Sequence, residues 1–123
     1  VLLGVDLPLP GLPSEVEAAS ADLQEALARE RLARRELRIA LARALGDLRA
    51  AEASLTDRRS ALAAVEEELA PVLGERLPGQ AIDPSTRHRL RISLLRARRD
   101  SYAAERRRHV ASIAIEALLG KPL

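Results

Sequence analysis

The two histidines are the first residues to test for chemistry, because imidazole binds metal ions and transfers protons. His88 and His109 lie 21 residues apart within one predicted helix, which corresponds to about 30 Å at about 1.5 Å per residue. They are therefore too far apart to bind one metal ion together. The chain contains no Cys, so thiolate ligands and thiol nucleophiles are excluded. We predict two ordinary surface or contact histidines, no metal site and no cofactor.

The acidic residues offer one further candidate site, the consecutive Glu66, Glu67 and Glu68. Successive positions of a helix point in different directions, so these carboxylates cannot converge on one cation. A solvated helix face is the better interpretation. The sequence also contains no phosphate-binding loop and no dinucleotide fingerprint. It therefore predicts a protein that is not an enzyme.

Arginines concentrate in the second half of the chain, although the formal net charge of the whole is only +2. Proteins that bind nucleic acid combine such charge with aromatic platforms or a reading motif, and Tyr102 is the only aromatic residue here. We therefore expect no nucleic-acid partner. We expect ion pairs with carboxylates of the first half, either across the antiparallel helices or between subunits, such as Glu30, Glu36, Asp47, Glu52 and Asp57. The basic residues are Arg87, Arg89, Arg91, Arg96, Arg98, Arg99, Arg106, Arg107 and Arg108.

The elements that carry these residues follow from composition. Hydrophobic residues make up 47% of the 123-residue chain and aromatic residues 1%, so the apolar content is nearly all Ala, Leu, Val and Ile. Such a composition is typical of helices with narrow contact seams and does not provide a broad core. The chain should therefore bury part of its apolar surface against partners.

The first predicted helix covers residues 14–70, after a short extended segment at residues 1–13. In that segment Val5, Leu7 and Leu9 alternate with polar residues and prolines, which is typical of a strand end. Ser14 precedes Glu17 by three residues, the spacing of a capping box. From there to residue 70 good helix formers dominate.

A heptad pattern gives this helix its contact face. The seam positions recur every seven residues, and a companion set lies between them, with small Ala at several positions that would permit close helix approach. Further apolar residues indicate a second apolar face. The seam is Leu41, Leu48, Leu55, Leu62 and Leu69; the companions are Leu37, Ala44, Ala51, Arg58 and Val65; the further residues are Leu23, Leu27, Leu32, Ile39 and Leu45.

A tip loop at residues 71–83, rich in Pro and Gly, separates this helix from a return helix at residues 84–119. Asp83 followed by Pro84 predicts an N-cap and a first helical residue. Gly120 predicts the helix end, with residues 120–123 as a terminal turn.

The return helix repeats the heptad pattern and again has apolar residues on the opposite side. We therefore predict an all-α fold, a long antiparallel coiled-coil hairpin whose helices pack on both sides. Its seam is Leu90, Ala97, Ala104, Ala111 and Leu118, with Leu94, Ser101, Arg108 and Ile115 as companions; Ile92, Leu95, Tyr102 and Ile113 lie opposite.

Four segments resemble the second structural repeat of the TolC family of outer-membrane efflux proteins. Residues 4–10 (GVDLPLP) are similar to the strand that leaves the barrel, residues 15–19 (EVEAA) to the helix start, and residues 79–83 (GQAID) to the hairpin tip. Residues 115–123 (IEALLGKPL) are similar to the closing segment. The order of strand end, long helix, tip and shorter return helix also resembles that repeat.

This resemblance implies a C-terminal repeat fragment of a homotrimeric protein. Its hairpins would form part of an α-barrel that crosses the bacterial periplasm, joined to the outer membrane through β-barrel segments that this chain lacks. The duct would passively conduct substrates exported by an inner-membrane pump. A periplasmic adaptor would contact the tip at Gly79, Ile82 and Asp83. Some family members close the gate with a Tyr and an Arg where this chain has Arg76 and Ala81, so no gate bond is assigned.

Two other functions stay open at this point. A stand-alone coiled-coil interaction protein, or a stalk associated with secretion, would use the same hairpin for docking, but it gives no role to the strand segment or the unequal helices. The second function is that of the hairpin of a periplasmic adaptor, for which flanking lipoyl-like β sequence would be expected.

Overall fold

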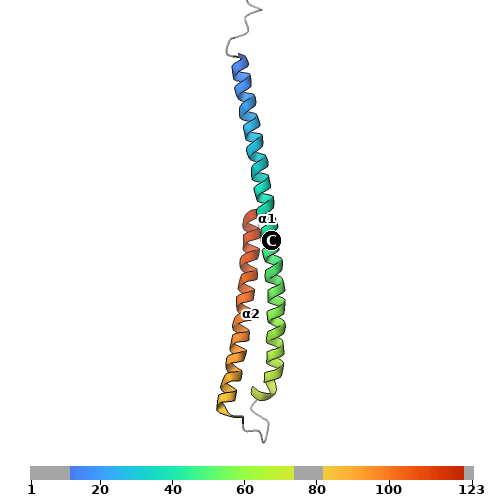
Figure 1. The fold of residues 1–123 in the computed structure, drawn as a ribbon, viewed down its shortest axis with the longest axis vertical. Coiled ribbons are helices and arrows are strands. Elements are labelled where there is room, and N and C mark those ends of the chain that lie inside the picture. The colour runs from blue at the N-terminus through green and yellow to red at the C-terminus, as the bar shows by residue number, and fades with distance from the viewer. Residues whose placement is uncertain (1–11, 74–81, 121–123) are drawn as a thin grey trace, which may run out of the picture. The chain divides into compact units, whose positions relative to one another are not determined.

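The computed structural model describes residues 12–73 and 82–120, and these ranges hold two helices and no strand (Figure 1). Helix α1 is Leu12–Leu73 and helix α2 is Pro84–Leu119. The predicted all-α class is therefore confirmed for the described ranges. The chain divides into two units, Val1–Ala40 and Leu41–Leu123. We call residues 12–40 the arm and the described part of the second unit the hairpin.

Helix α1 extends beyond the predicted bounds at both ends. It begins at Leu12, so Ser14 lies in the first turn and is not the N-cap, and Leu12 and Pro13 are helical where an extended segment was expected. Proline fits a first turn because the N–H that it lacks would have no intrahelical acceptor there. The rest of the predicted extended segment, residues 1–11, lies outside the described residues.

The C-terminal end of α1 includes three residues that were predicted to belong to the tip loop. The helix continues through Pro71 to Leu73. A proline this close to the helix end removes one backbone hydrogen bond. Leu69 is buried and Val72 half-buried in the same stretch, so packing favours the extra turn. Residues 74–81 of the predicted tip lie outside the described residues.

Helix α2 has the bounds that were predicted, and its ends explain why. Asp83 is the N-cap and Pro84 the first helical residue. The Asp83 carboxylate accepts a hydrogen bond from the Ser85 hydroxyl, and the Arg87 N–H donates to the Asp83 carbonyl over 3.0 Å. At the other end Gly120 has φ 67°, and its N–H donates to the Glu116 carbonyl. Glycine suits this left-handed position because it has no Cβ.

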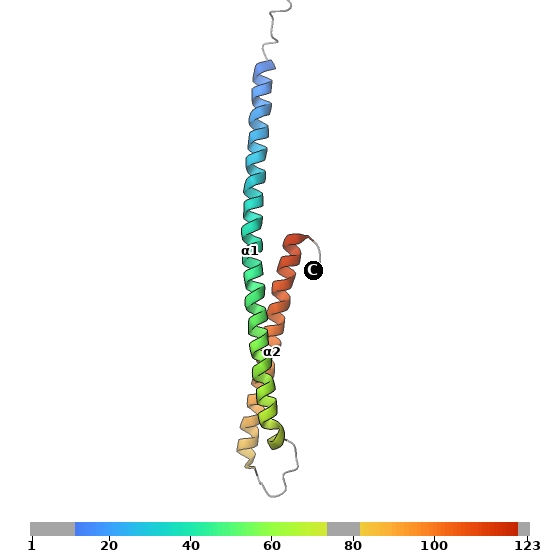
Figure 2. The same cartoon turned by 90° about the vertical axis from the view of Figure 1, so that its right-hand side faces the viewer.

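Within the hairpin, α2 packs against the second half of α1 in the antiparallel direction. Figures 1 and 2 both place the C-terminal end of α1 and the N-terminal end of α2 at the same end of the hairpin. The core between them is thin and consists of small and branched aliphatic residues. Its buried apolar members are Ala44, Leu55, Leu69, Ala104, Ala111 and Ile115.

The arm, taken by itself, is a single helical segment with all side chains from residue 13 to 39 exposed. Two pairs four residues apart, Glu25 with Arg29 and Glu30 with Arg34, form salt bridges along it. Leu23 and Leu27, which were predicted to belong to the second apolar face, are in fact in heptad register with Leu37 and Leu41. The seam pattern therefore begins within the arm.

Candidate interaction surfaces

The contact face of the hairpin is the first surface that the structure defines. All ten predicted seam residues, from Leu41 to Leu69 and from Leu90 to Leu118, are buried or half-buried. Ile115, a companion position, is the most buried side chain, with 2% of its surface exposed. Ser101, also a companion, is buried at 6%. Small side chains on α2 allow α1 to approach closely.

Two arginines occupy companion positions but do not enter the core. The side chains of Arg58 and Arg108 are 56% and 55% exposed, because an unpaired guanidinium inside an aliphatic seam would lose its hydration. Each reaches a carboxylate of the other helix at the edge of the seam. Arg58 Nη1 lies 3.9 Å from Asp100 Oδ2, and Arg108 Nε lies 3.8 Å from Glu52 Oε1.

Two shorter ion pairs also join the helices. Arg59 Nη2 lies 2.6 Å from Glu105 Oε1, and Arg98 Nη2 lies 3.4 Å from Glu66 Oε1. In these pairs a higher residue number in α1 goes with a lower number in α2, which is the antiparallel arrangement. Exposed pairs of this kind each contribute roughly 0.2–1 kcal/mol. They act mainly by selecting one register of the two helices.

Sequence reasoning found some of these ionic partners and missed others. Glu52 was expected to form an ion pair with an arginine of the second helix, and it does. Glu30 binds Arg34 within the arm instead. Glu66 was interpreted as part of a solvated face, yet it binds Arg98. The signal that would have identified Glu66 is its position at the edge of the Leu62 and Leu69 seam, where side chains reach across to the partner helix.

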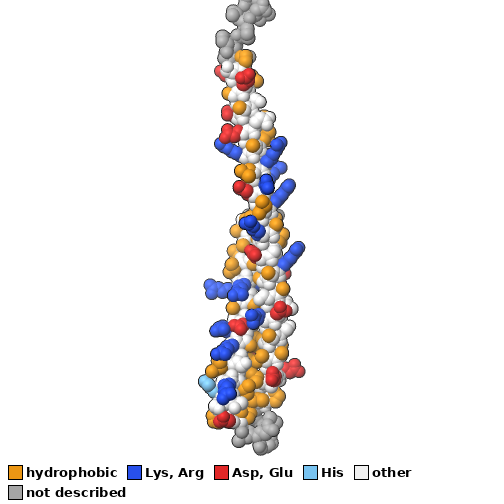
Figure 3. Space-filling view, viewed as in Figure 1, with side chains coloured by type: hydrophobic (Ala, Val, Ile, Leu, Met, Phe, Trp, Pro, Cys, Tyr) orange, Lys and Arg blue, Asp and Glu red, His pale blue; other side chains and the backbone are white. Residues whose placement is uncertain are grey.

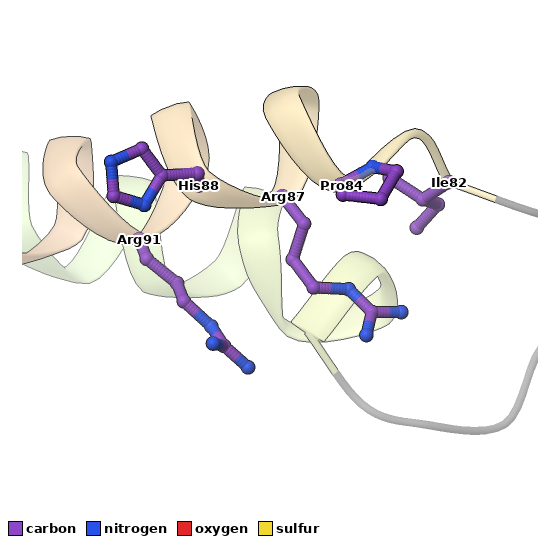
Figure 4. Close-up of a pocket in the computed structure, with 5 residues that line it drawn as sticks. All are labelled: Ile82, Pro84, Arg87, His88 and Arg91. Carbon is purple, nitrogen blue, oxygen red and sulfur yellow. The ribbon is translucent and has the colours of Figure 1, made fainter.

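The predicted tip residues are only partly described. Ile82 is half-buried and Asp83 is exposed, and both directly precede α2. Gly79 lies outside the described residues. Beside Ile82 the structure has a shallow groove, lined by Ile82, Pro84, Arg87, His88 and Arg91. Figure 4 shows the guanidinium groups of Arg87 and Arg91 extending to the same side of α2.

This end of α2 is unusually basic for a helix N-terminus. The first turn contains no acidic residue, and neither Arg87 nor Arg91 forms a salt bridge within the described ranges. The partial positive charge of the macrodipole is confined to the first turn, where the Asp83 carboxylate at the N-cap opposes it, and both arginines lie beyond that turn.

On α2, the side opposite the contact face carries large exposed apolar residues. Leu95, Tyr102 and Ile113 are 62%, 69% and 47% exposed. At about 100° per residue these three fall within about 20° of each other, whereas Ala104 of the contact face lies about 180° from Leu95. Of the residues predicted for this second face, Ile92 is half-buried. Figure 3 shows basic side chains gathered over α2 in the same view as Figure 1.

On α1, the corresponding outer side carries small side chains instead of large ones. A shallow groove is lined there by Ala50, Ala53, Asp57 and Ala61, and it reaches the edge of the contact face at half-buried Ser54 and at Arg58. Gly46 lies on the same side, and a Cβ added to it would meet nothing within 4 Å. The two outer sides of the hairpin thus differ in shape, one with projecting side chains and one with a shallow groove.

The candidate chemistry considered from the sequence does not assemble in the described ranges. His88 and His109 are both exposed on α2, and no group of three or more His, Asp or Glu side chains is placed there to hold a metal ion. Neither described helix has a stretch long and apolar enough to cross a membrane.

No protein-family model matches the chain, and comparison with curated proteins and with solved structures finds no significant match.

Proposed function

We propose that this chain is the periplasmic helical-hairpin portion of a bacterial outer-membrane efflux duct of the TolC type. In this proposal the duct is a homotrimer that passively conducts substrates exported by an inner-membrane pump. A periplasmic adaptor docks at the hairpin tip, and β-barrel segments outside this chain join the duct to the outer membrane. The chain itself would perform no chemical reaction.

The observation that carries the proposal is the difference in length between α1, with 62 residues, and α2, with 36 residues, where the hairpin itself contains residues 41–73 of α1. A simple docking hairpin gives no role to the unequal lengths of the two helices. The motifs at residues 79–83 and 115–123 resemble the duct family at the two ends of the return helix. The unequal lengths and the family-like ends of α2 support the same assignment.

Apolar surface on both sides of α2 also supports it. A helix in a hollow barrel needs a neighbour on each side, so it carries two apolar faces. In the hairpin α2 has its contact face around Ala104 and an exposed apolar face around Tyr102. A two-helix hairpin that acted alone would leave the second face uncovered in water.

The tip is the place where the proposal can be tested. In cells that depend on the full-length protein for efflux, we expect Ile82→Arg to reduce adaptor-dependent efflux by about tenfold, because a charge would replace the apolar side chain beside the docking groove. Efflux, expression level and chemical cross-linking to the adaptor would be measured together. Efflux and cross-linking both unchanged at equal expression would contradict the tip assignment.

Ile39→Arg is the matched control. Ile39 is an exposed isoleucine of the arm, at 45%, so the substitution makes the same change in charge and size away from the tip. We expect it to leave adaptor cross-linking unchanged. Equal loss of cross-linking in both variants would point to a general effect of added charge.

The alternative function is a stand-alone coiled-coil interaction protein or a stalk associated with secretion. The arm favours it, because Leu23, Leu27 and Leu37 present an exposed seam to a helix from another protein. The gene distinguishes the two functions. A signal peptide and an upstream second copy of the hairpin pattern would support the duct, and a reading frame that encodes this hairpin alone would support the alternative.

A further inference from the structure

The arm, residues 12–40, carries an apolar seam that lies uncovered in its own unit. Val16, Leu23, Leu27 and Leu37 are all exposed, and their heptad register places them on one stripe of the helix. Within the described residues this unit contains no second helix. Most helical stability in proteins comes from packing of an apolar face, so a helix that covered this seam would stabilise the arm.

Charge is distributed unequally along the arm. Residues 12–25 contain four carboxylates and no basic residue, whereas residues 26–40 contain five arginines and only two carboxylates. Figure 3 shows this change along α1, from acidic side chains near its N-terminal end to basic ones farther along. Two arms that ran side by side in the same direction would bring like charges together. Two antiparallel arms would instead bring each acidic half against a basic half.

Two charged residues in the seam itself favour the antiparallel direction. Glu30 lies seven residues from Leu23 and Leu37, and Arg34 lies seven residues from Leu27, so both occupy seam positions. In a parallel pair in register, each seam position meets the same position of the other helix. Glu30 would then meet Glu30 of the second copy, and Arg34 would meet Arg34. The antiparallel registers of the seam place neither residue against itself.

From the exposed seam and the unequal charge of its two halves, we infer that a second copy of the chain docks on the arm, with the two arms antiparallel along their seams. The inference goes beyond the proposed duct, whose copies would all run in one direction. It does not depend on a pump, an adaptor or a membrane. The contact is isologous, because both copies use the same seam about a two-fold axis, so it closes as a dimer.

The heptad spacing restricts the register of this dimer. Antiparallel registers that match seam to seam differ by steps of seven residues. The register in which residues 12–40 of the two copies overlap most fully is centred near residue 25. Leu23 of each copy then faces Leu27 of the other, and these four leucines form the centre of the contact.

The two edges of the seam also match in this register. On one edge Glu17 comes opposite Arg31 of the second copy, and neither residue forms a salt bridge within the described ranges. On the other edge Ala26 comes opposite Ala26, and Ala19 comes opposite Ala33. Small side chains on this edge allow the two helices to approach closely.

The chain contains no Cys, so single-cysteine variants of the full chain test the direction and register. Ala19→Cys, Ala26→Cys and Ala33→Cys make the same small change at exposed positions seven residues apart. With a short bis-maleimide cross-linker, we expect Ala26→Cys to form covalent dimers. Ala19→Cys and Ala33→Cys should each form less than about a tenth as much, because the two thiols would be about 21 Å apart along the axis. A mixture of these two variants should form covalent dimers readily.

The pattern of cross-links distinguishes this contact from the proposed duct. A parallel assembly places each of the three positions at the same separation from its own copy. Equal cross-linking of the three variants would therefore overturn the inference and leave the proposed function standing. An absence of covalent dimers from Ala26→Cys, or from the mixture, would also overturn it.

Charge reversal measures the contact without a cross-linker. Sedimentation equilibrium of the full chain would compare the unaltered protein with Glu17→Arg and Arg31→Glu. We expect each variant to dimerise about tenfold more weakly, because like charges then face each other at both ends of the contact. An equimolar mixture should recover dimerisation, since both pairs of the mixed dimer again have opposite charges. A mixture that stays monomeric while circular dichroism shows unchanged helicity would overturn the register.

Asp22→Arg is the matched control. Asp22 belongs to the same acidic half, but at about 100° per residue it lies about 100° from Leu23 and about 140° from Leu27, away from the seam. The substitution makes the same change in charge as Glu17→Arg. We expect dimerisation to stay within about threefold of that of the unaltered chain, because exposed charges outside a contact are largely screened. A tenfold loss would mean that the total charge of the acidic half controls association, and would overturn the pairing of Glu17 with Arg31.

Discussion

Arg59 and Glu105, 46 residues apart in the sequence, bind each other across the hairpin, with 2.6 Å between Arg59 Nη2 and Glu105 Oε1. This contact exists only in the antiparallel arrangement of α1 and α2. Both side chains remain largely in solvent, at 61% and 44% exposure. The pair therefore reports on orientation more than it stabilises the hairpin.

A double-mutant cycle on this pair measures the coupling free energy between the two side chains and so tests that orientation. We expect Arg59→Glu and Glu105→Arg each to lower the free energy of unfolding by roughly 0.5–1 kcal/mol, through like-charge repulsion and loss of the pair. The exchanged double variant should regain most of that loss. Urea unfolding followed by circular dichroism gives the four values. Strictly additive losses would show that the two residues do not meet in solution.

Ile115→Ala tests the thin core. Ile115 is 2% exposed, and truncation of a buried isoleucine costs about 2–5 kcal/mol in well-packed proteins. We expect the free energy of unfolding to fall by about 2 kcal/mol. This value is at the lower end of the range because a two-helix seam can partly close over the cavity. Ile113→Ala, two residues away and 47% exposed, should change the free energy of unfolding by less than about 0.5 kcal/mol. Equal losses at both positions would contradict the assignment of the contact face.

Two glycines of the hairpin should respond to alanine in opposite directions. Gly46 lies within α1, and an added Cβ meets nothing within 4 Å, so Gly46→Ala should stabilise the helix by up to about 1 kcal/mol. Gly120 has φ 67°, where an L side chain is strained, so Gly120→Ala should destabilise by about 1 kcal/mol. Thermal unfolding of both variants at equal protein concentration would measure these changes. A stabilising Gly120→Ala would mean that α2 does not end at this residue.

Zinc titration tests the prediction that the chain binds no transition metal tightly. His88 and His109 lie on one helix too far apart to share an ion, and each alone would bind zinc weakly. Calorimetry on the full chain should therefore detect no binding with a Kd below about 1 µM. A sub-micromolar site that disappears in His88→Ala would overturn the prediction and place a ligand set beside the tip groove.

The heptad spacing of leucines and alanines was enough to predict the contact face, because a seven-residue repeat allows only one stripe of a helix to meet a partner. Asp83 with Pro84, and Gly120, predicted the ends of α2 because their backbone preferences are local. The ends of α1 were predicted less well. Ser14 is compatible with a cap and with a first turn, and packing of Leu69 and Val72 carries the helix past Pro71.

Ionic partners were the part that the sequence predicted least. Arg98 could reach several carboxylates of α1 in the linear sequence, and its choice of Glu66 depends on the relative register of two helices. That register arises from packing along the whole seam and from the connection between the helices. It is not visible in the spacing of residues along either helix alone.

Arg58 and Arg108, at the edges of the seam, restrict how such a hairpin can change length. A seam of leucines and alanines alone could slip by seven residues and still bury apolar side chains. After such a slip Arg58 would lose Asp100, and Arg108 would lose Glu52. A seven-residue insertion in one helix between these pairs and the tip would force that slip or a bulge. Matched insertions of seven residues in both helices would preserve both pairs, so related hairpins of different length should differ by whole heptads in α1 and α2 together.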